Sequence, residues 1–184
     1  MARIDRSAGV KQRIRAQAAR LFAERGFTGT SIRGIAAAAG VDPTIVLRHF
    51  GSKVNLFLET LSLPTEWSGL LSGPLDEVPT RLLSFLLEGD EPSQQGPAIY
   101  AAMIRATEFD QVRDKVQESL DRVITEPLTK RLTGEDAALR AHLFSCGIVG
   151  ILTSQWVIGA PEHGPENNKE LIQHYAKALR TLLY

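Results

Sequence analysis

The spacing of apolar residues predicts helices along almost the whole chain. In residues 9–25 the apolar side chains recur every three or four positions, which places Val10, Ile14 and Leu21 on one stripe of a helix. Gly26 follows this stripe and suits the left-handed backbone that often ends a helix. No segment alternates between apolar and polar residues for long enough to indicate a strand. The pattern therefore predicts an all-α fold.

Three short helices are expected next. The first covers residues 31–39, and the second covers residues 43–49, with Asp42 as its cap and Pro43 in its first turn. The third begins at Lys53. Two short helices joined by a tight turn are typical of a helix-turn-helix, whose second helix enters the major groove of duplex DNA.

The rest of the chain forms a larger body. Residues 62–80 hold three prolines and two glycines, and this change of composition marks a domain boundary. We therefore expect a DNA-binding head over residues 1–58 and a helical body over residues 59–184, with about nine helices in all. Body helices are expected over residues 76–88, 97–107, 110–132 (interrupted or kinked at Pro127), 135–158 and 169–183.

Charge supports the assignment of the head. The whole chain is neutral, but residues 1–55 carry ten basic and three acidic side chains, a net charge of +7, and residues 56–184 carry a net charge of −7. Basic side chains neutralise phosphates and release counterions, so a cationic segment that contains a helix-turn-helix indicates binding to nucleic acid. A solvated charged surface is the alternative.

The candidate DNA contacts lie on the second short helix and at the ends of its neighbours. Arginines there can reach base edges or phosphates, and hydroxyl groups at helix N-termini suit phosphate oxygens. Each residue also has a plainer role: Asp42 can serve only as a cap, His49 can support Phe50, and the arginines can lie in solvent. The candidate DNA-binding residues are Thr30, Ser31, Arg33, Asp42, Pro43, Thr44, Leu47, Arg48, His49 and Lys53.

A longer pattern at fixed spacing joins these positions. It consists of Phe22, Gly26, Phe27, Thr30, Ser31, Ile32, Arg33, Ile35, Ala36, Ala39, Gly40, Val41, His49, Phe50, Ser52, Lys53 and Leu56. The pattern resembles that of the TetR family of bacterial transcriptional regulators and covers about residues 9–58. One position departs from it: the family usually has an aromatic residue, most often a tyrosine that binds a phosphate, where this chain has Leu47. Leu47 can contact a thymine methyl group or pack against a sugar instead.

The resemblance implies a dimer that acts most often as a repressor. In such proteins the last two helices of each protomer pair with their copies as a four-helix bundle, and a half-site reader needs a second copy for specific affinity. The same apolar stripes could instead form the core of one protomer. The candidate dimer residues are Gly147, Ile148, Gly150, Ile151, Leu171, Ile172, Tyr175, Leu179 and Leu182.

The resemblance also implies an inducer pocket in the body. Apolar walls with a few polar groups describe a ligand site, although they describe a protein core equally well. The body has no cluster of charges, so we expect an apolar or amphipathic small molecule that favours a dimer state released from the DNA operator. The candidate pocket residues are Trp67, Phe85, Tyr100, Met103, Thr107, Phe109, His142, Phe144 and Trp156.

Other classes of protein are disfavoured. The sequence contains no hydrolase motif, no nucleotide-binding loop and no metal-binding spacing of ligands. We therefore expect no enzyme activity, no cofactor and no metal. No run of eighteen apolar residues indicates a membrane span, and a lone cysteine, Cys146, fits a core position in a cytoplasmic protein. Two alternatives stay open: a non-specific architectural DNA binder, and a regulator gated by a protein partner or by no ligand.

Overall fold

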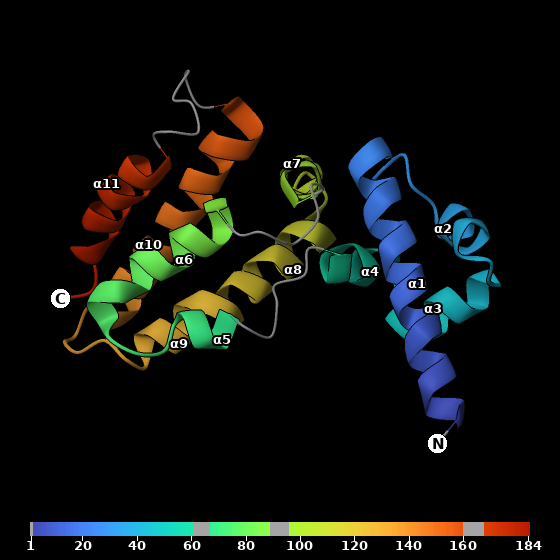
Figure 1. The fold of residues 1–184 in the computed structure, drawn as a ribbon, viewed down its shortest axis with the longest axis horizontal. Helices are drawn as coiled ribbons and strands as arrows, with labels where there is room; N and C mark the ends of the chain where they lie inside the picture. Colours follow the sequence, from blue (N-terminus) through green and yellow to red (C-terminus); the bar gives the residue numbers. More distant parts are fainter. Residues whose placement is uncertain (1, 61–66, 89–95, 160–167) are drawn as a thin grey trace. The chain divides into compact units, whose positions relative to one another are not determined.

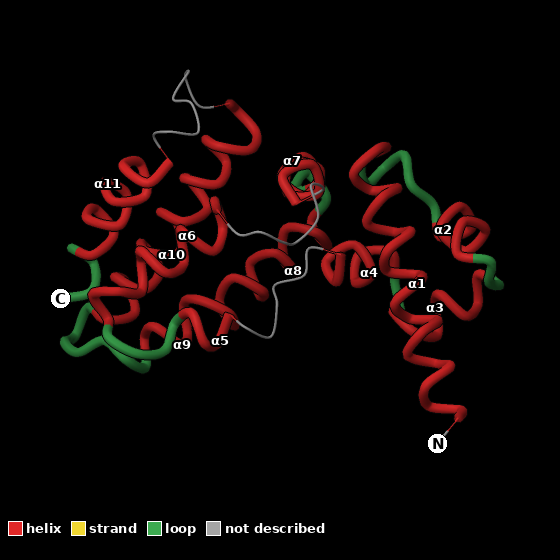
Figure 2. Tube along the Cα trace, in the orientation of Figure 1, coloured by secondary structure: helices red, strands yellow, loops and turns green. Residues whose placement is uncertain are grey.

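The structure is a computed structural model that describes residues 2–60, 67–88, 96–159 and 168–184. All regular structure in these ranges is helical, with no strand (Figure 2), and the predicted all-α class is confirmed. The chain divides into two compact units, which are described separately. The first contains residues 1–62 and 93–116, and the second contains residues 63–92 and 117–184.

The first unit is built on its N-terminal helix. Around α1 (Ala2–Arg25) pack α2 (Ile32–Ala39), α3 (Pro43–Phe50), α4 (Lys53–Thr60) and α7 (Gly96–Ala106), and the unit also includes the start of α8 (Asp110–Leu120) (Figure 1). Their shared core holds side chains that are almost fully buried: Ile14, Ala18, Phe22, Ile35, Val46, Phe50, Leu56 and Phe57.

Helix α1 begins seven residues before the position expected from its apolar stripe. The expected start was Gly9, but the helix already begins at Ala2. Gly9 is exposed, and glycine weakens a helix interior by only about 1 kcal/mol relative to alanine, so the helix continues through it.

The second unit contains the remaining helices. They are α5 (Trp67–Leu70), a 3₁₀ turn η1 (Leu75–Glu77), α6 (Val78–Glu88), a π-helical segment η2 (Asp121–Thr125), α9 (Glu126–Thr129), α10 (Ala137–Thr153), a second π-helical segment η3 (Ser154–Gly159) and α11 (Asn168–Arg180). Helix α6 packs along α11, and α10 packs on α9 and η2. Phe144, Ile148, Leu82 and Leu128 are buried in its core.

The predicted interruption at Pro127 is confirmed. The helix that starts at Asp110 widens into η2 just before Pro127, which lies in the first turn of α9. Proline lacks the N–H that would bond the preceding turn, and a local π-turn is a common way to accommodate such a break.

The two compact units do not have the same boundaries as the expected head and body. Helix α7 and the start of α8, both expected in the body, belong to the same compact unit as the helix-turn-helix. Residues 89–95 and most of 159–168, which lie between the expected helices, are outside the described residues.

One helical stretch among the described residues, Ala137–Gly159, is long and apolar enough by length and composition to cross a membrane. It is not an unbroken apolar run, since Arg140 and His142 lie within it. A single stretch of this kind is weak evidence for a membrane span, because core helices of soluble proteins meet the same criterion. Here one side of the stretch carries the core residues Phe144 and Ile148.

Candidate nucleic-acid interface

The second helix of the motif has a well-formed N-terminus. Asp42 caps α3, and its Oδ1 accepts hydrogen bonds from the Thr44 backbone N–H (2.8 Å) and from the Thr44 hydroxyl. The bond from the Thr44 hydroxyl, followed by the bond from its backbone N–H, holds the pKa of Asp42 below its ordinary value of 3.8. The ionised Asp42 carboxylate stabilises the fold, and this contribution is lost only as the pH falls through the lowered pKa. The cap is therefore intact at neutral pH.

The turn between α2 and α3 depends on one glycine. Gly40 ends α2 with φ of 64°, and its N–H bonds back to the carbonyl of Ala37 at 3.2 Å. The Val41 N–H bonds to the carbonyl of Ala36 at 3.0 Å. This pairing satisfies carbonyls at the helix end and directs the chain into α3.

Helix α3 buries one face and exposes the other. Val46 and Phe50 are 0% and 4% exposed and anchor the helix on the core, whereas Thr44, Leu47 and Arg48 are exposed. Residues three and four positions apart lie on one side of a helix, so these three side chains share an outward face. Leu47 is 45% exposed, so its side chain is accessible on this face.

The neighbouring helix ends present further polar groups. Ser31 caps α2, and its hydroxyl oxygen accepts a hydrogen bond from the Gly34 N–H at 3.0 Å. Ser31 and Arg33 are exposed. His49 is half-buried, with its ring centroid 6.2 Å from that of Phe50, so the supporting role considered for it is realised in the structure.

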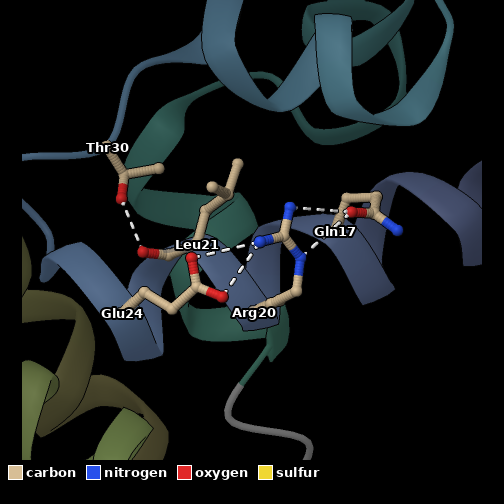
Figure 3. Close-up of polar contacts among 5 residues, drawn as sticks. All are labelled: Gln17, Arg20, Leu21, Glu24 and Thr30. Atoms are coloured by element: carbon tan, nitrogen blue, oxygen red, sulfur yellow. Dashed lines mark hydrogen bonds and ion pairs between the residues drawn. The ribbon is translucent and has the colours of Figure 1, made fainter.

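Thr30 differs from expectation. Its side chain is 3% exposed, and its hydroxyl donates to the carbonyl oxygens of Leu21 (3.0 Å) and Gly26 (2.8 Å) at the end of α1; Figure 3 shows the bond to Leu21. The hydroxyl is therefore committed inside the protein and joins the end of α1 to the start of α2. A direct bond from this hydroxyl to a phosphate does not fit that arrangement.

Two of the basic residues in the head are also paired within the protein. The Arg20 guanidinium donates to Glu24 at 2.9 Å and to Gln17, as Figure 3 shows, and Lys11 lies 3.0 Å from Glu59. Glu24 is already included in the net charge of +7, so only the pairing of Lys11 with Glu59, which lies beyond residue 55, lowers the positive charge below the sequence count.

Lys53, at the start of α4, lies over an aromatic ring. Its Nζ is 4.3 Å from the ring centroid of Phe27, and desolvation lowers the pKa of its amine. The sequence pattern contains both residues but did not predict their contact, because Phe27 lies in the turn after α1, Lys53 lies on α4, and their spacing carries no periodic signal.

Comparison with known proteins identifies the fold. Residues 14–60 match the family described as bacterial regulatory proteins of the tetR family, and residues 76–183 match the tetracyclin repressor-like C-terminal domain. The second match alone covers more than half of the chain. The chain belongs to the TetR family of bacterial regulators. Members of the family are soluble, non-enzymatic proteins that bind DNA operators and act as dimers, which confirms the expectation that the chain is not an enzyme.

Individual relatives agree with this membership. A segment of 54 residues is 39% identical to the HTH-type transcriptional repressor AcnR of Corynebacterium glutamicum, and it spans 29% of each protein. A TetR-family regulator from Streptomyces coelicolor matches with a TM-score of 0.63 and 27% identity over 95% of this chain and 94% of its own. NalD, the secondary repressor of the MexAB-OprM multidrug efflux pump in Pseudomonas aeruginosa, has a TM-score of 0.71 at 18% identity over 97% and 98% of the two chains and so shares the fold.

The predicted pocket residues are distributed over both units. Tyr100, Met103, Thr107 and Phe109 belong to the first unit, and Phe85, His142, Phe144 and Trp156 belong to the second. The side chain of Trp67 lies outside the described residues.

Several of these positions are filled by tight packing. Phe144, Tyr100 and Met103 are 0%, 8% and 9% exposed, so atoms of the protein cover them almost completely. The Thr107 hydroxyl donates to the carbonyl of Ile104 at 2.7 Å. Phe109 is 40% exposed. The structure thus gives at least three of the candidates a core role.

Four of the nine predicted dimer residues are buried inside one protomer. Ile148, Ile151, Ile172 and Leu179 are 1%, 8%, 2% and 6% exposed. A Cβ added at Gly147 would lie 2.6 Å from a Leu179 methyl group, so Gly147 allows α10 and α11 of the same chain to approach closely. The alternative that these stripes form the core is realised for these residues.

The opposite side of α10 carries two leucines that the sequence analysis did not single out. Leu139 and Leu143 are 58% and 44% exposed, and Cys146 and Gly150 on the same side are also exposed. Cys146 was expected in the core; instead its Sγ lies 3.5 Å from Nε2 of the exposed His142. We call Leu139, Leu143, Cys146 and Gly150 the outer α10 stripe. Their spacing of four, three and four residues was a signal available in the sequence, masked by the more apolar inner stripe.

The described residues hold no group of three or more His, Cys, Asp or Glu side chains that could bind a metal ion.

Proposed function

We propose that this TetR-family regulator is a dimeric, operator-binding repressor. The observation that carries the proposal is the outward face of α3, where Thr44, Leu47 and Arg48 are exposed on a capped helix anchored by Val46 and Phe50. A helix so anchored can enter the major groove with its side chains directed at base edges. The family membership and the relation to AcnR support the role as a repressor.

The candidate DNA contacts fall into two groups: those that can read the base sequence and those that bind phosphates. Arg48 can pair with a guanine edge and Leu47 can meet a thymine methyl group, so both carry sequence information. Ser31, Arg33 and Lys53 lie at helix starts or on the first helix of the motif and suit phosphates, which carry none. Asp42 and Pro43 set the start of α3, and Thr44, whose hydroxyl proton is directed to Asp42, offers its oxygen as an acceptor.

The test is fluorescence anisotropy of the purified protein with the DNA upstream of its own gene, beside a scrambled duplex, across a salt series. A specific regulator prefers the first duplex at physiological salt and binds as two protomers per site. Arg48→Ala should lower that preference, whereas Arg122→Ala, which removes an exposed arginine outside the basic segment, should not. Equal binding of both duplexes that disappears with salt would reject a specific role at this site and favour a non-specific DNA binder.

The second copy is proposed to dock on the outer α10 stripe. Burying a large aliphatic side chain contributes about 1.5–3 kcal/mol, and a two-fold interface counts Leu139 and Leu143 twice. This proposal revises the predicted interface. Of the residues predicted for it, the exposed Gly150 belongs to the outer α10 stripe, and the half-buried Leu171, Tyr175 and Leu182 remain candidates.

The molar mass in solution tests this interface. Leu143→Glu should shift the protein from dimer to monomer, because two carboxylates would meet near the two-fold axis. Gln111→Glu adds the same charge at an exposed position on α8 and should leave the dimer intact. A dimer that persists in Leu143→Glu would place the interface elsewhere.

We further propose that an apolar or amphipathic small molecule binds in the body, residues 59–184, and releases the operator. The protein would act in the cytoplasm and off the membrane. Gating by a protein partner or by no ligand is the second candidate, and the tight burial of Phe144, Tyr100 and Met103 favours it. A ligand screen read as loss of anisotropy separates the two: a molecule that binds and releases DNA supports the first, and one that binds without changing operator affinity rejects the coupling.

A further inference from the structure

Four phenylalanines of the first unit form one aromatic cluster. The centroids of Phe22 and Phe57 are 4.7 Å apart, and Phe27 lies 5.1 Å from Phe57 and 6.2 Å from Phe22. Phe109 completes the cluster at 5.8 Å from Phe27. Aromatic pairs at these separations attract one another beyond the area that they bury, so each ring helps to orient the next.

The members of the cluster differ in their freedom to move. Phe22 and Phe57 are fully buried on α1 and α4. Phe27 is half-buried in the turn after α1, where Gly26 adopts φ of 69°. Its ring is therefore held by its neighbours more than by its own backbone element, and Phe109 is one of the rings that hold it.

Phe109 comes from a part of the chain far from the helix-turn-helix in sequence. It lies in the turn between α7 and α8, where its N–H bonds to the carbonyl of Ala106 (3.1 Å) and its own carbonyl accepts the Val112 N–H (2.9 Å). The helical run that begins at Asp110 continues to Thr129, and its residues after Val116 belong to the second unit.

Phe27 also carries the amine of Lys53. The 4.3 Å separation between Nζ and the ring centroid is that of a cation–π contact, and it restricts a side chain that otherwise has several rotatable bonds. Desolvation beside the ring, seen in the lowered pKa of the amine, indicates that the contact shields Lys53 partly from water.

We propose that Phe109 is a positioning residue for DNA binding: through the ring of Phe27 it holds the Lys53 amine where it meets a phosphate. The contact places a residue of the α7–α8 turn one ring away from a DNA-binding cation. A change in the α7–α8 turn then alters the backbone affinity for DNA without touching the reading face of α3. This inference rests on the proposed operator binding.

A double-mutant cycle tests the chain of contacts. Phe109→Ala should weaken operator binding about threefold per protomer, the size of an exposed cation–π contact, and make the salt dependence shallower by up to about 0.9 per protomer. In a Lys53→Ala background the same substitution should have no further effect. Phe109→Leu, which retains apolar packing, should recover part of the affinity, and Tyr184→Ala, which removes an aromatic ring that is 74% exposed, should change nothing.

A second measurement needs no DNA. The Lys53 ε-methylene protons should be shifted upfield in the NMR spectrum by the Phe27 ring current, and Phe109→Ala should move them toward the values of an exposed lysine. Unchanged Lys53 shifts, or an equal loss of affinity in the Lys53→Ala background, would overturn the proposal. If the wild-type protein shows no operator preference, the proposed function fails separately, and the NMR result alone decides whether Phe109 positions Lys53.

Discussion

Thr30 offers the sharpest test of how the head is built. Its hydroxyl was expected to face a phosphate, and the structure instead places it in the interior, donating to the carbonyl of Leu21 (Figure 3) and to that of Gly26. Thr30→Val keeps the shape and volume of the side chain but removes the donor. The substitution therefore separates the internal role from a role in DNA binding.

The expected effect is on stability. A buried acceptor that loses its partner destabilises the fold by about 1–3 kcal/mol, and the Gly26 carbonyl, just after the end of α1, loses a bond that the helix does not replace. In a chain of this size each kcal/mol lowers the midpoint of thermal unfolding by about 2–4 °C. Thermal unfolding followed by circular dichroism measures this shift.

Matched controls make the result decisive. Thr30→Ser retains the hydroxyl and should keep most of the stability, while Thr28→Val removes an exposed hydroxyl from the same turn and should leave the stability unchanged. Well below its unfolding midpoint, Thr30→Val should bind operator DNA with nearly unchanged affinity. A Thr30→Val protein with wild-type stability but weakened binding to all DNA would refute the reasoning and restore the phosphate role.

The remaining predictions concern the motif and its packing. Lys53→Ala should weaken binding to specific and random duplexes alike, as a salt series on both would measure, whereas Arg48→Ala should cost about 1–3 kcal/mol of operator affinity and relax the base preference at one position of the site. Gly40→Ala should destabilise the protein by about 1–2 kcal/mol in chemical denaturation, because φ of 64° strains any residue with a Cβ. Gly147→Ala should destabilise it by about 1–3 kcal/mol through overpacking against Leu179, and Leu179→Ala in the same chain should relieve that clash.

The head shows how far local pattern reaches. The cap at Asp42 and the proline in the first turn of α3 follow from neighbouring residues, and the structure agrees with both. Helix propensity, capping and periodicity act over a few residues, so a sequence carries this information directly.

The contacts of single side chains were harder to predict from the sequence. Thr30 could equally have faced solvent or the end of α1, because a hydroxyl at a helix start suits a phosphate and a backbone carbonyl alike. Thr30 faces the interior because the carbonyl of Leu21, nine residues earlier in the chain, accepts its hydroxyl proton. Likewise, nothing in the local sequence around Phe109 indicates that it joins the rings of the head.

The amino-acid sequence by itself determined the family, the all-α class and the recognition helix, because these rest on short-range spacing and on a long series of matched residues. Tertiary structure decided which apolar stripe of α10 serves the protomer and which remains exposed. Both stripes have helical spacing, and α9, η2 and Leu179 of α11 cover one of them. Burial is a property of packed neighbours distant along the chain, and periodicity reports that a face is apolar without identifying what covers it.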